Sequence, residues 1–384
     1  MNDRRLLLAA RGLRAFAFGF SAVLIGIHLE RRGLDAGLIG LTIGIGLAAA
    51  SLSGLATAWL AARVGRRATL SVCGVLMVVT GLDLAASTND VALIASGLTG
   101  MLGAASVDLG PFSSIEQSML AEAVSERDRN LAFGRYSLVA GLANAAGGAA
   151  AAFATAGSSS SFYYVYAAIG AATAVLPALM SRRVETAEPP VAFGSFRPLA
   201  LLSALFALDS LGGGFVANAV IAYWLHARFG ATTAYLGPMF AVVALLQALS
   251  YEVSGRLGTR IGLVNTMVFT HLPSNLLLLA VPFAPNLGVA TAVLFARFAL
   301  SQMDVPARQA YLSSIVPPAE RAGALAMTGA VRGVAQSFGP ALTGVAIGAS
   351  AFGFPFWAGG GLKIVYDLAL YAGFRTKRAS HETR

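Results

Sequence analysis

Charged side chains are scarce in this chain of 384 residues. Only 12% of the residues are Asp, Glu, Lys or Arg, and 57% are hydrophobic, with a mean hydropathy of +0.71. Soluble domains carry about 25% charged residues, so this composition excludes a soluble enzyme and a disordered chain. The net charge of +9 does not indicate a nucleic-acid binder, because the basic residues fall in short clusters between apolar runs rather than in one patch.

Cysteine and histidine are also rare. The one cysteine, Cys73, lies in an apolar run, so a single chain can hold neither a disulfide framework nor a cysteine metal site. The four histidines form no HExxH motif and no group with metal-ligand spacing. We therefore expect no metal and no cofactor. A membrane-embedded enzyme would need a clustered nucleophile, base or metal set, and a channel an ordered pore motif, so both remain remote alternatives.

Long apolar segments are what the chain has in abundance. A membrane-spanning helix needs roughly 20 apolar residues. Twelve segments are predicted to span a membrane, with short turns that make neighbours antiparallel, and the fold class is therefore an all-α polytopic membrane protein. The segments are 6–29, 38–61, 68–87, 91–121, 130–156, 162–180, 198–226, 232–257, 263–283, 287–303, 322–349 and 354–374.

The basic residues predict the orientation of these segments. With the N-terminus in the cytoplasm, 18 Lys or Arg residues fall inside, 3 fall outside and 6 lie within the spans. Cytoplasmic loops of membrane proteins carry such an excess of basic residues. We expect a multi-pass protein of the cytoplasmic membrane, the inner membrane of a bacterial cell, with both termini in the cytoplasm.

The sequence repeats at half its length. Glu116-Gln117-Ser118-Met119-Leu120 matches Arg308-Gln309-Ala310-Tyr311-Leu312, 192 residues later, and Gly19-Phe20 matches Gly214-Phe215. The same 192-residue offset relates Gly147 to Gly339. Parallel repeats of six helices are known in transporters, with the substrate between them. The predicted organisation is a first bundle over 1–180, a linker over 181–197, a second bundle over 198–374 and a basic tail over 375–384.

A basic loop motif follows the second segment and recurs after the eighth. The copies read Ala58-Trp59-Leu60-Ala61-Ala62-Arg63-Val64-Gly65-Arg66-Arg67 and Gly255-Arg256-Leu257-Gly258-Thr259-Arg260-Ile261-Gly262. With the repeat and the orientation, they make the chain resemble bacterial-type, twelve-helix transporters of the major facilitator superfamily, whose motif is roughly Gly-x-Leu-Ala-Asp-Arg-x-Gly-Arg-Arg. The resemblance implies two pseudo-symmetric six-helix bundles and alternating access.

The resemblance also implies that this loop helps to close the cytoplasmic gate. The residues concerned are Arg63, Gly65, Arg66, Arg67, Gly255, Arg260 and Gly262. Both acids of the motif are replaced, by Ala62 and Thr259, so we expect Arg66 and Arg260 to pair with Asp128, Glu320 or the C-terminal ends of helices.

Charges inside the spans are candidates for function, because a charge at the bilayer centre costs about 2.5–3.5 kcal/mol on insertion scales. Arg14 and Asp209 occupy repeat-related positions, at an offset of 195. They are predicted to form either a structural ion pair between the halves or a site where Asp209 takes up the coupling proton and Arg14 holds the substrate or the counter-charge. Lys363 and Asp367 share a helix face at i, i+4 and can neutralise each other. Arg297 resembles an arginine that the family carries in its tenth helix.

A second set of charges lies near the predicted cytoplasmic ends of the spans. Asp108 and Glu116 precede and follow Pro111 in one repeat, as Asp304 and Arg308 flank Pro306 in the other. Together with Arg135 and Arg332 they are predicted to form gate-closing ion pairs. His271 and Asn275 share a helix face, and we expect a satisfied polar pair there, because two ligands are too few for a metal.

The function that these observations favour is secondary active transport. No nucleotide-binding motif is present, so an ion gradient is the expected energy source, and buried carboxylates beside arginines favour protons. The expected partners are a small organic solute, protons and the lipid bilayer, with the chain acting as a monomer. Export is favoured on the family resemblance, and an uptake symporter or a facilitator of a small metabolite is the alternative.

Overall fold

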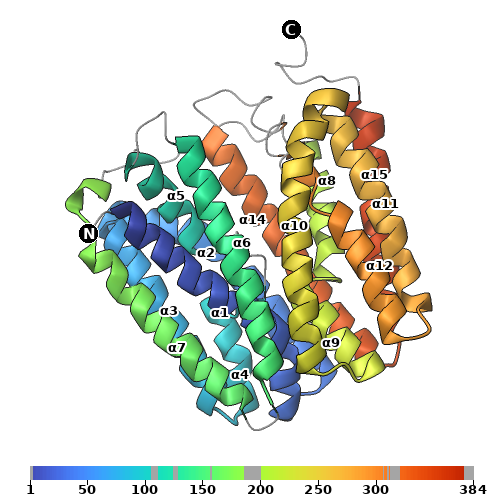
Figure 1. Ribbon diagram of the computed structural model, residues 1–384, viewed down its shortest axis with the longest axis horizontal. Helices are drawn as coiled ribbons and strands as arrows, with labels where there is room; N and C mark the ends of the chain where they lie inside the picture. Colours follow the sequence, from blue (N-terminus) through green and yellow to red (C-terminus); the bar gives the residue numbers. More distant parts are fainter. Residues whose placement is uncertain are drawn as a thin grey trace.

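The computed structural model describes residues 3–104, 111–123, 129–155, 158–185, 200–305, 307–308, 311 and 321–375, and these residues form an all-helical protein (Figure 1). Its α-helices are α1 (Asp3–Arg31), α2 (Ala36–Val64), α3 (Arg66–Ala86), α4 (Asp90–Ala95), α5 (Pro111–Ala123), α6 (Arg129–Ala150), α7 (Ser159–Val175), α8 (Ala200–Gly214), α9 (Asn218–Phe229), α10 (Thr233–Ile261), α11 (Leu263–Ala280), α12 (Leu287–Leu300), α14 (Arg321–Gly348) and α15 (Phe354–Phe374). We call α1–α7 the first half and α8–α15 the second half.

Two of the predicted spans are not single helices. The segment predicted over 91–121 begins with α4 and a 3₁₀ turn (Ser96–Thr99), leaves helical geometry at Gly100 and Gly103, and resumes as α5. Both glycines have positive φ, at 71° and 68°, which ends a helix. The segment over 198–226 is divided into α8 and α9 after three consecutive glycines that end at Gly214. Seven helical stretches of the described residues are long and apolar enough to cross a membrane.

The repeated glycines mark the same helix crossing in each half. Gly19 and Gly147 lie where α1 crosses α6, and Gly214 and Gly339 lie where α8 crosses α14. A side chain at any of these positions would meet the backbone of the neighbouring helix. The sequence repeat is therefore a repeat of backbone contacts, because only glycine permits two helices to approach so closely.

The two copies of the loop motif also share one geometry. Gly65 ends α2 with φ 93° and ψ 155°, and Gly262 ends α10 with φ 87° and ψ 160°. Residues with a side chain rarely adopt a positive φ. The glycine of each copy is thus required by the sharp turn that leads into α3 and α11.

The two halves pack together at one end of the molecule and separate towards the other (Figure 1). We call the end that holds the start of α1 and the end of α15 the termini end, and the opposite end the far end. Gly40 of α2 packs on the backbone of Pro340 and Gly344 of α14 near the far end. Farther along the same two helices, a side chain at Gly54 or Gly329 would meet no atom within 4 Å. Among the described residues, the halves are therefore in contact near the far end, and open space lies beside Gly54 and Gly329 towards the termini end.

Candidate functional site

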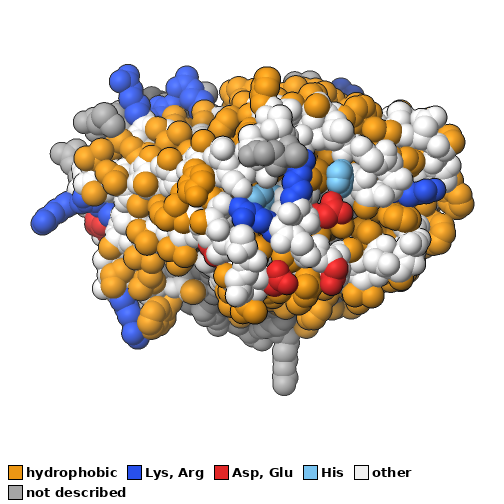
Figure 2. All heavy atoms as spheres, turned by 90° about the horizontal axis from the view of Figure 1, so that it is seen from below, with side chains coloured by type: hydrophobic (Ala, Val, Ile, Leu, Met, Phe, Trp, Pro, Cys, Tyr) orange, Lys and Arg blue, Asp and Glu red, His pale blue; other side chains and the backbone are white. Residues whose placement is uncertain are grey.

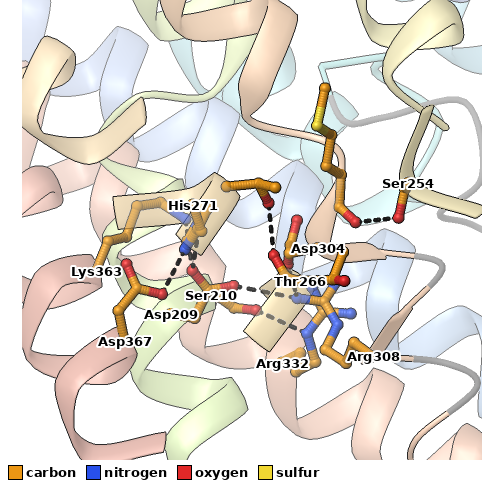
Figure 3. A network of polar contacts seen from close by, with 12 residues as sticks. Asp209, Ser210, Ser254, Thr266, His271, Asp304, Arg308, Arg332, Lys363 and Asp367 are labelled. Carbon is orange, nitrogen blue, oxygen red and sulfur yellow. Dashed lines mark hydrogen bonds and ion pairs between the residues drawn. The ribbon is translucent and has the colours of Figure 1, made fainter. Parts of the chain in front are cut away.

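Asp209 is the centre of a buried polar network in the second half (Figure 3). It lies in α8, 4% exposed, five residues before the helix ends. Lys363 Nζ of α15 lies 2.6 Å from its Oδ1, and Arg308 Nη1 lies 3.3 Å from its Oδ2. His271 Nε2 of α11 lies 3.7 Å from Oδ1. Cations close to both oxygens hold Asp209 as a charged carboxylate in this conformation.

A second carboxylate joins the network through the same histidine. Asp367 of α15 is fully buried, and its oxygens lie 2.9 Å from His271 Nδ1 and 2.9 Å from Asn275 Nδ2. An ionised carboxylate only accepts hydrogen bonds, so the contact with His271 requires a proton on Nδ1 or on Asp367. His271 therefore connects two acids, and at least one transferable proton lies between His271 and Asp367.

Two arginines extend the network towards the first half. Arg308 Nη1 donates to Asp304 Oδ2 at 2.8 Å as well as to Asp209. Arg332 Nε of α14 donates to Ser210 Oγ at 3.0 Å, beside Asp209. Figure 3 shows Lys363 and His271 on one side of Asp209 and the two arginines on the other. Because α14 packs along α2 of the first half, a change at Asp209 can reach the contact between the halves.

The first half has its own buried ion pair. Arg14 of α1 donates to Glu116 Oε2 of α5, and Tyr136 Oη of α6 donates to the same oxygen at 2.7 Å. The Arg14 guanidinium lies 4.0 Å from the centre of the Phe112 ring, and Arg11 lies over the Tyr136 ring at 4.5 Å. Each half thus neutralises its own buried charge.

This arrangement corrects the predicted pair between Arg14 and Asp209. The two residues occupy repeat-related positions, but each pairs within its own half. The halves separate towards the termini end, while an opposite charge within each half lies in direct contact. At short range in a low-dielectric interior the nearest opposite charge dominates, so the pair between the halves is not formed in this conformation.

The predicted pair of Lys363 and Asp367 is also wrong. Both side chains are buried, but Lys363 binds Asp209 and Asp367 binds His271 and Asn275. The i, i+4 spacing puts both residues on one face, and that face contacts α8 and α11, which offer closer partners. The predicted contact of His271 and Asn275 is formed, with Asn275 Nδ2 3.2 Å from His271 Nδ1 in a larger network. The pair is not fully satisfied, because the buried Asn275 Oδ1 has no hydrogen-bond partner among the described residues.

The predicted gate residues that the structure describes fall into separate groups, with Asp304, Arg308 and Arg332 together in the second half. Glu116 and Arg308 serve the ion pairs described above, inside their own halves, and Arg135 is exposed. Asp108, Asp128 and Glu320 lie outside the described residues. Arg297 of α12 is buried, and its Nε has no hydrogen-bond partner among the described residues. Ion pairs between the halves from this set are not found among the described residues, so gating by this set remains a prediction.

The loop motif of the first half has an acid that the sequence did not reveal. Glu185 accepts hydrogen bonds from the backbone N–H groups of Arg66, at 2.8 Å, and Arg67, at 3.1 Å. Its carboxylate thereby caps the N-terminus of α3. Arg66 Nη1 donates to the carbonyl of Val184, whereas Arg63 is exposed and stacks on the Trp59 ring. In the second copy Arg260 is exposed and Gly255 lies within α10.

Glu185→Gln should lower the melting temperature of the purified protein. The amide keeps one acceptor oxygen, loses the charge and points an NH₂ group at a backbone donor, and losing an N-terminal cap costs about 0.5–2 kcal/mol. Thermal unfolding in detergent measures the change. Asp90→Asn, at an exposed acid in the first turn of α4, is the matched control. Equal shifts in the two variants would show that Glu185 does not anchor the loop.

Comparison with known proteins places this geometry in a family. A family model described as Major Facilitator Superfamily matches residues 7–300 and 202–384. The chain belongs to the major facilitator superfamily. It is accordingly a secondary transporter and not an enzyme, and the family predicted from the loop motif and the repeat is confirmed.

One relative and several solved structures resemble the chain over nearly its full length. The uncharacterized membrane protein YJR124C of Saccharomyces cerevisiae (strain ATCC 204508 / S288c) is 24% identical over 421 residues, which cover 97% of this chain and 94% of the yeast protein. The crystal structure of the nucleoside transporter NupG superposes with a TM-score of 0.78 at 16% identity, over 98% of this chain and all of that one. A D-xylose-proton symporter gives 0.72 at 16% identity, over 95% and 97%. These structures confirm the predicted fold of the transporter, and its bacterial type stays a prediction.

Proposed function

We propose that this transporter exports a small organic solute in exchange for protons, as a monomer, with Asp209 as the group that carries the coupling proton. The observation that supports the proposal most is the buried chain from Asp367 through His271 to Asp209. Such a chain provides a shared proton, a titratable relay and a carboxylate in contact with cations. One structural neighbour, the D-xylose-proton symporter, has the same coupling ion in its name.

The proposed mechanism uses the charge of Asp209 to choose between two conformations. Protonation would neutralise Asp209 and leave Lys363 and Arg308 without one of their counter-charges. Breaking a buried ion pair costs about 3–5 kcal/mol, and a population shift from 1:99 to 99:1 needs about 5.5 kcal/mol. One proton at this site can therefore supply most of the free energy needed to reverse the preferred conformation. Arg308 and Arg332 would couple the loss of charge on Asp209 to α14, which packs against the first half.

The predicted orientation assigns the termini end to one side of the membrane. We propose that the termini end faces the cytoplasm, on the excess of Lys and Arg residues in the loops on that side. In this proposal the conformation described above, with the halves in contact at the far end and Asp209 charged, is the inward-facing state.

Cysteine labelling tests this orientation. In a Cys73→Ala background, a cysteine at Ser161 or Asn286, both exposed at the far end, should react with a membrane-impermeant maleimide added to intact cells. A cysteine at Glu188, in the predicted linker, should react only after the membrane is broken. Labelling of position 188 in intact cells would reverse the orientation.

A flux measurement tests the function. A thermal-shift screen of metabolites and drugs first finds a solute that stabilises the purified protein. Proteoliposomes with an acidic lumen and a trapped pH dye then receive that solute outside. Antiport makes the lumen more alkaline as the solute enters. Acidification would instead indicate a symporter, and solute entry with an unchanged lumen pH would indicate a facilitator. Either result overturns proton-coupled export.

A further inference from the structure

An ion pair joins the two halves at the far end. Glu30 lies in the last turn of α1 and His226 in the last turn of α9. His226 Nε2 lies 3.1 Å from Glu30 Oε2, and Tyr223 Oη donates to Glu30 Oε1 at 3.5 Å. The side chains of His226 and Glu30 are 30% and 41% exposed, so bulk protons can reach them. Figure 2 shows this face, where acidic, basic and histidine side chains gather at the centre between two mainly apolar regions.

A second contact orients the His226 ring. His226 Nδ1 lies 2.8 Å from the carbonyl oxygen of Ala231. A carbonyl oxygen only accepts, so Nδ1 carries the hydrogen, and in a neutral ring Nε2 is then an acceptor. A neutral His226 would place two acceptors, Nε2 and the Glu30 carboxylate, 3.1 Å apart, whereas an imidazolium would place opposite charges there.

The other charged and titratable groups nearby are engaged elsewhere. Arg31 donates to the carbonyl of Thr155, and Arg32 to Ser160 and to the carbonyl of Ala85. Arg228 lies over the rings of Phe229 and Phe352, and Asp35 caps α2 by accepting from Leu38 N–H. Tyr223 donates to Glu30 itself. Among the described residues, His226 is thus the basic side chain that faces Glu30.

The neighbouring contacts between the halves do not depend on pH. Gly26 of α1 packs against the Tyr223 side chain, and Thr233 Oγ1 of α10 donates to the carbonyl of Ala154 at 2.6 Å. These contacts are neutral. Histidine is the side chain whose ordinary pKa lies between pH 5 and 8, so a histidine in a contact between the halves can make that contact depend on pH.

We infer that His226 and Glu30 form a proton-binding site which holds the outer gate closed when the outside is acidic and releases it when the proton leaves. The inference rests on the proposed orientation and on transport by alternating access, and it does not need Asp209 to be the coupling site. Protonation adds an attraction that exists only when the far end is closed. Loss of the proton leaves two acceptors, Nε2 and the carboxylate, facing each other.

The distance between spin labels at Ser161 and Asn286, one in each half, tests the inference. Pulsed electron resonance in nanodiscs, in a Cys73→Ala/Asp209→Asn background without solute, gives the fraction of molecules open at the far end without the pH dependence proposed for Asp209. Raising the pH from 5.5 to 8 should increase the ratio of open to closed molecules about two- to fivefold, the size expected for a solvent-accessible ion pair. His226→Gln and Glu30→Gln should each abolish this response, and the double variant should match the single ones.

Two further variants assign the response. Arg228→Gln, which removes a charge from the same turn of α9, should keep the full pH response. Restoring Asp209 should add the response proposed for the central site, which acts in the opposite direction because its protonation favours the other conformation. A response that survives His226→Gln in the Asp209→Asn background, or that is missing from that background, overturns the inference. A response that persists while solute moves without protons would leave the outer site in place and overturn the proposed antiport.

Discussion

Asp209→Asn is expected to abolish proton-driven accumulation of the solute while leaving solute exchange intact. The amide keeps the size and polarity of the side chain but cannot gain or lose a proton. The transporter should therefore run as a facilitator, with an accumulation ratio of about 1 whatever the pH gradient, because a gradient can drive only a step that it is coupled to. Counterflow in proteoliposomes, with and without a pH gradient, measures both properties.

The substitution also leaves Lys363 and Arg308 with less counter-charge, so a loss of stability must be separated from a loss of coupling. Removing one partner of a buried pair costs about 3–5 kcal/mol, whereas replacing both by neutral groups is often tolerated. The double variant Asp209→Asn/Lys363→Met should therefore recover much of the melting temperature but none of the coupling. Recovery of pH-driven accumulation in the double variant would show that Asp209 acts only through the fold.

Glu116→Gln is the matched control in the first half. Glu116 is buried and paired with Arg14 much as Asp209 is paired with Lys363. It has no histidine relay among the described residues, so the variant should be less stable but still coupled. If Asp209→Asn still concentrates its solute against a gradient, Asp209 is not the proton site, and Asp367 or Asp108 would be tested next.

Gly40→Leu should nearly eliminate transport by preventing closure of the far end. The backbone of α14 lies against Gly40, so a leucine side chain cannot fit without separating α2 from α14. Overpacking typically costs about 1–3 kcal/mol where side chains can move, and about 3 kcal/mol or more is expected here because the obstacle is backbone. The population should shift to molecules open at the far end, read from the same Ser161–Asn286 distance, and the transport rate should fall more than about 100-fold, since each 1.4 kcal/mol is about tenfold.

Gly54→Leu on the same helix should act in the opposite direction. Gly54 has no atom within 4 Å in this conformation, so a leucine is accommodated here. It should obstruct the approach of α2 and α14 when the termini end closes, and so trap the conformation described above. Gly361→Leu, at another glycine with open space around it, should leave the distance distribution unchanged. If Gly40→Leu and Gly54→Leu shift the distribution in the same direction, the two ends do not alternate.

The sequence alone determined the architecture of this protein. Apolar segments long enough to cross a bilayer have few alternatives to helix, because every backbone polar group in lipid must be satisfied within the segment. The repeat predicted two similar halves, and its glycines proved to be the helix crossings. Gly40 and Gly44 of α2 both lie against the backbone of α14, which again needs a residue without a side chain. The loop motif, together with the repeat and the orientation, indicated the family.

Which charged side chains form pairs depends on the tertiary structure. The spacing of Lys363 and Asp367 shows that they share a face of α15, but it contains no distance to Asp209 or His271, which lie more than 90 residues away. The same holds for Glu185, whose role depends on where the chain after α7 passes the start of α3. In a low-dielectric interior the attraction between two opposite charges weakens as their separation increases. The strongest ion pair is therefore formed with the nearest opposite charge. Which opposite charge is nearest depends on how helices far apart in the sequence pack together. The sequence therefore identified the charged residues of the site but did not predict which of them pair.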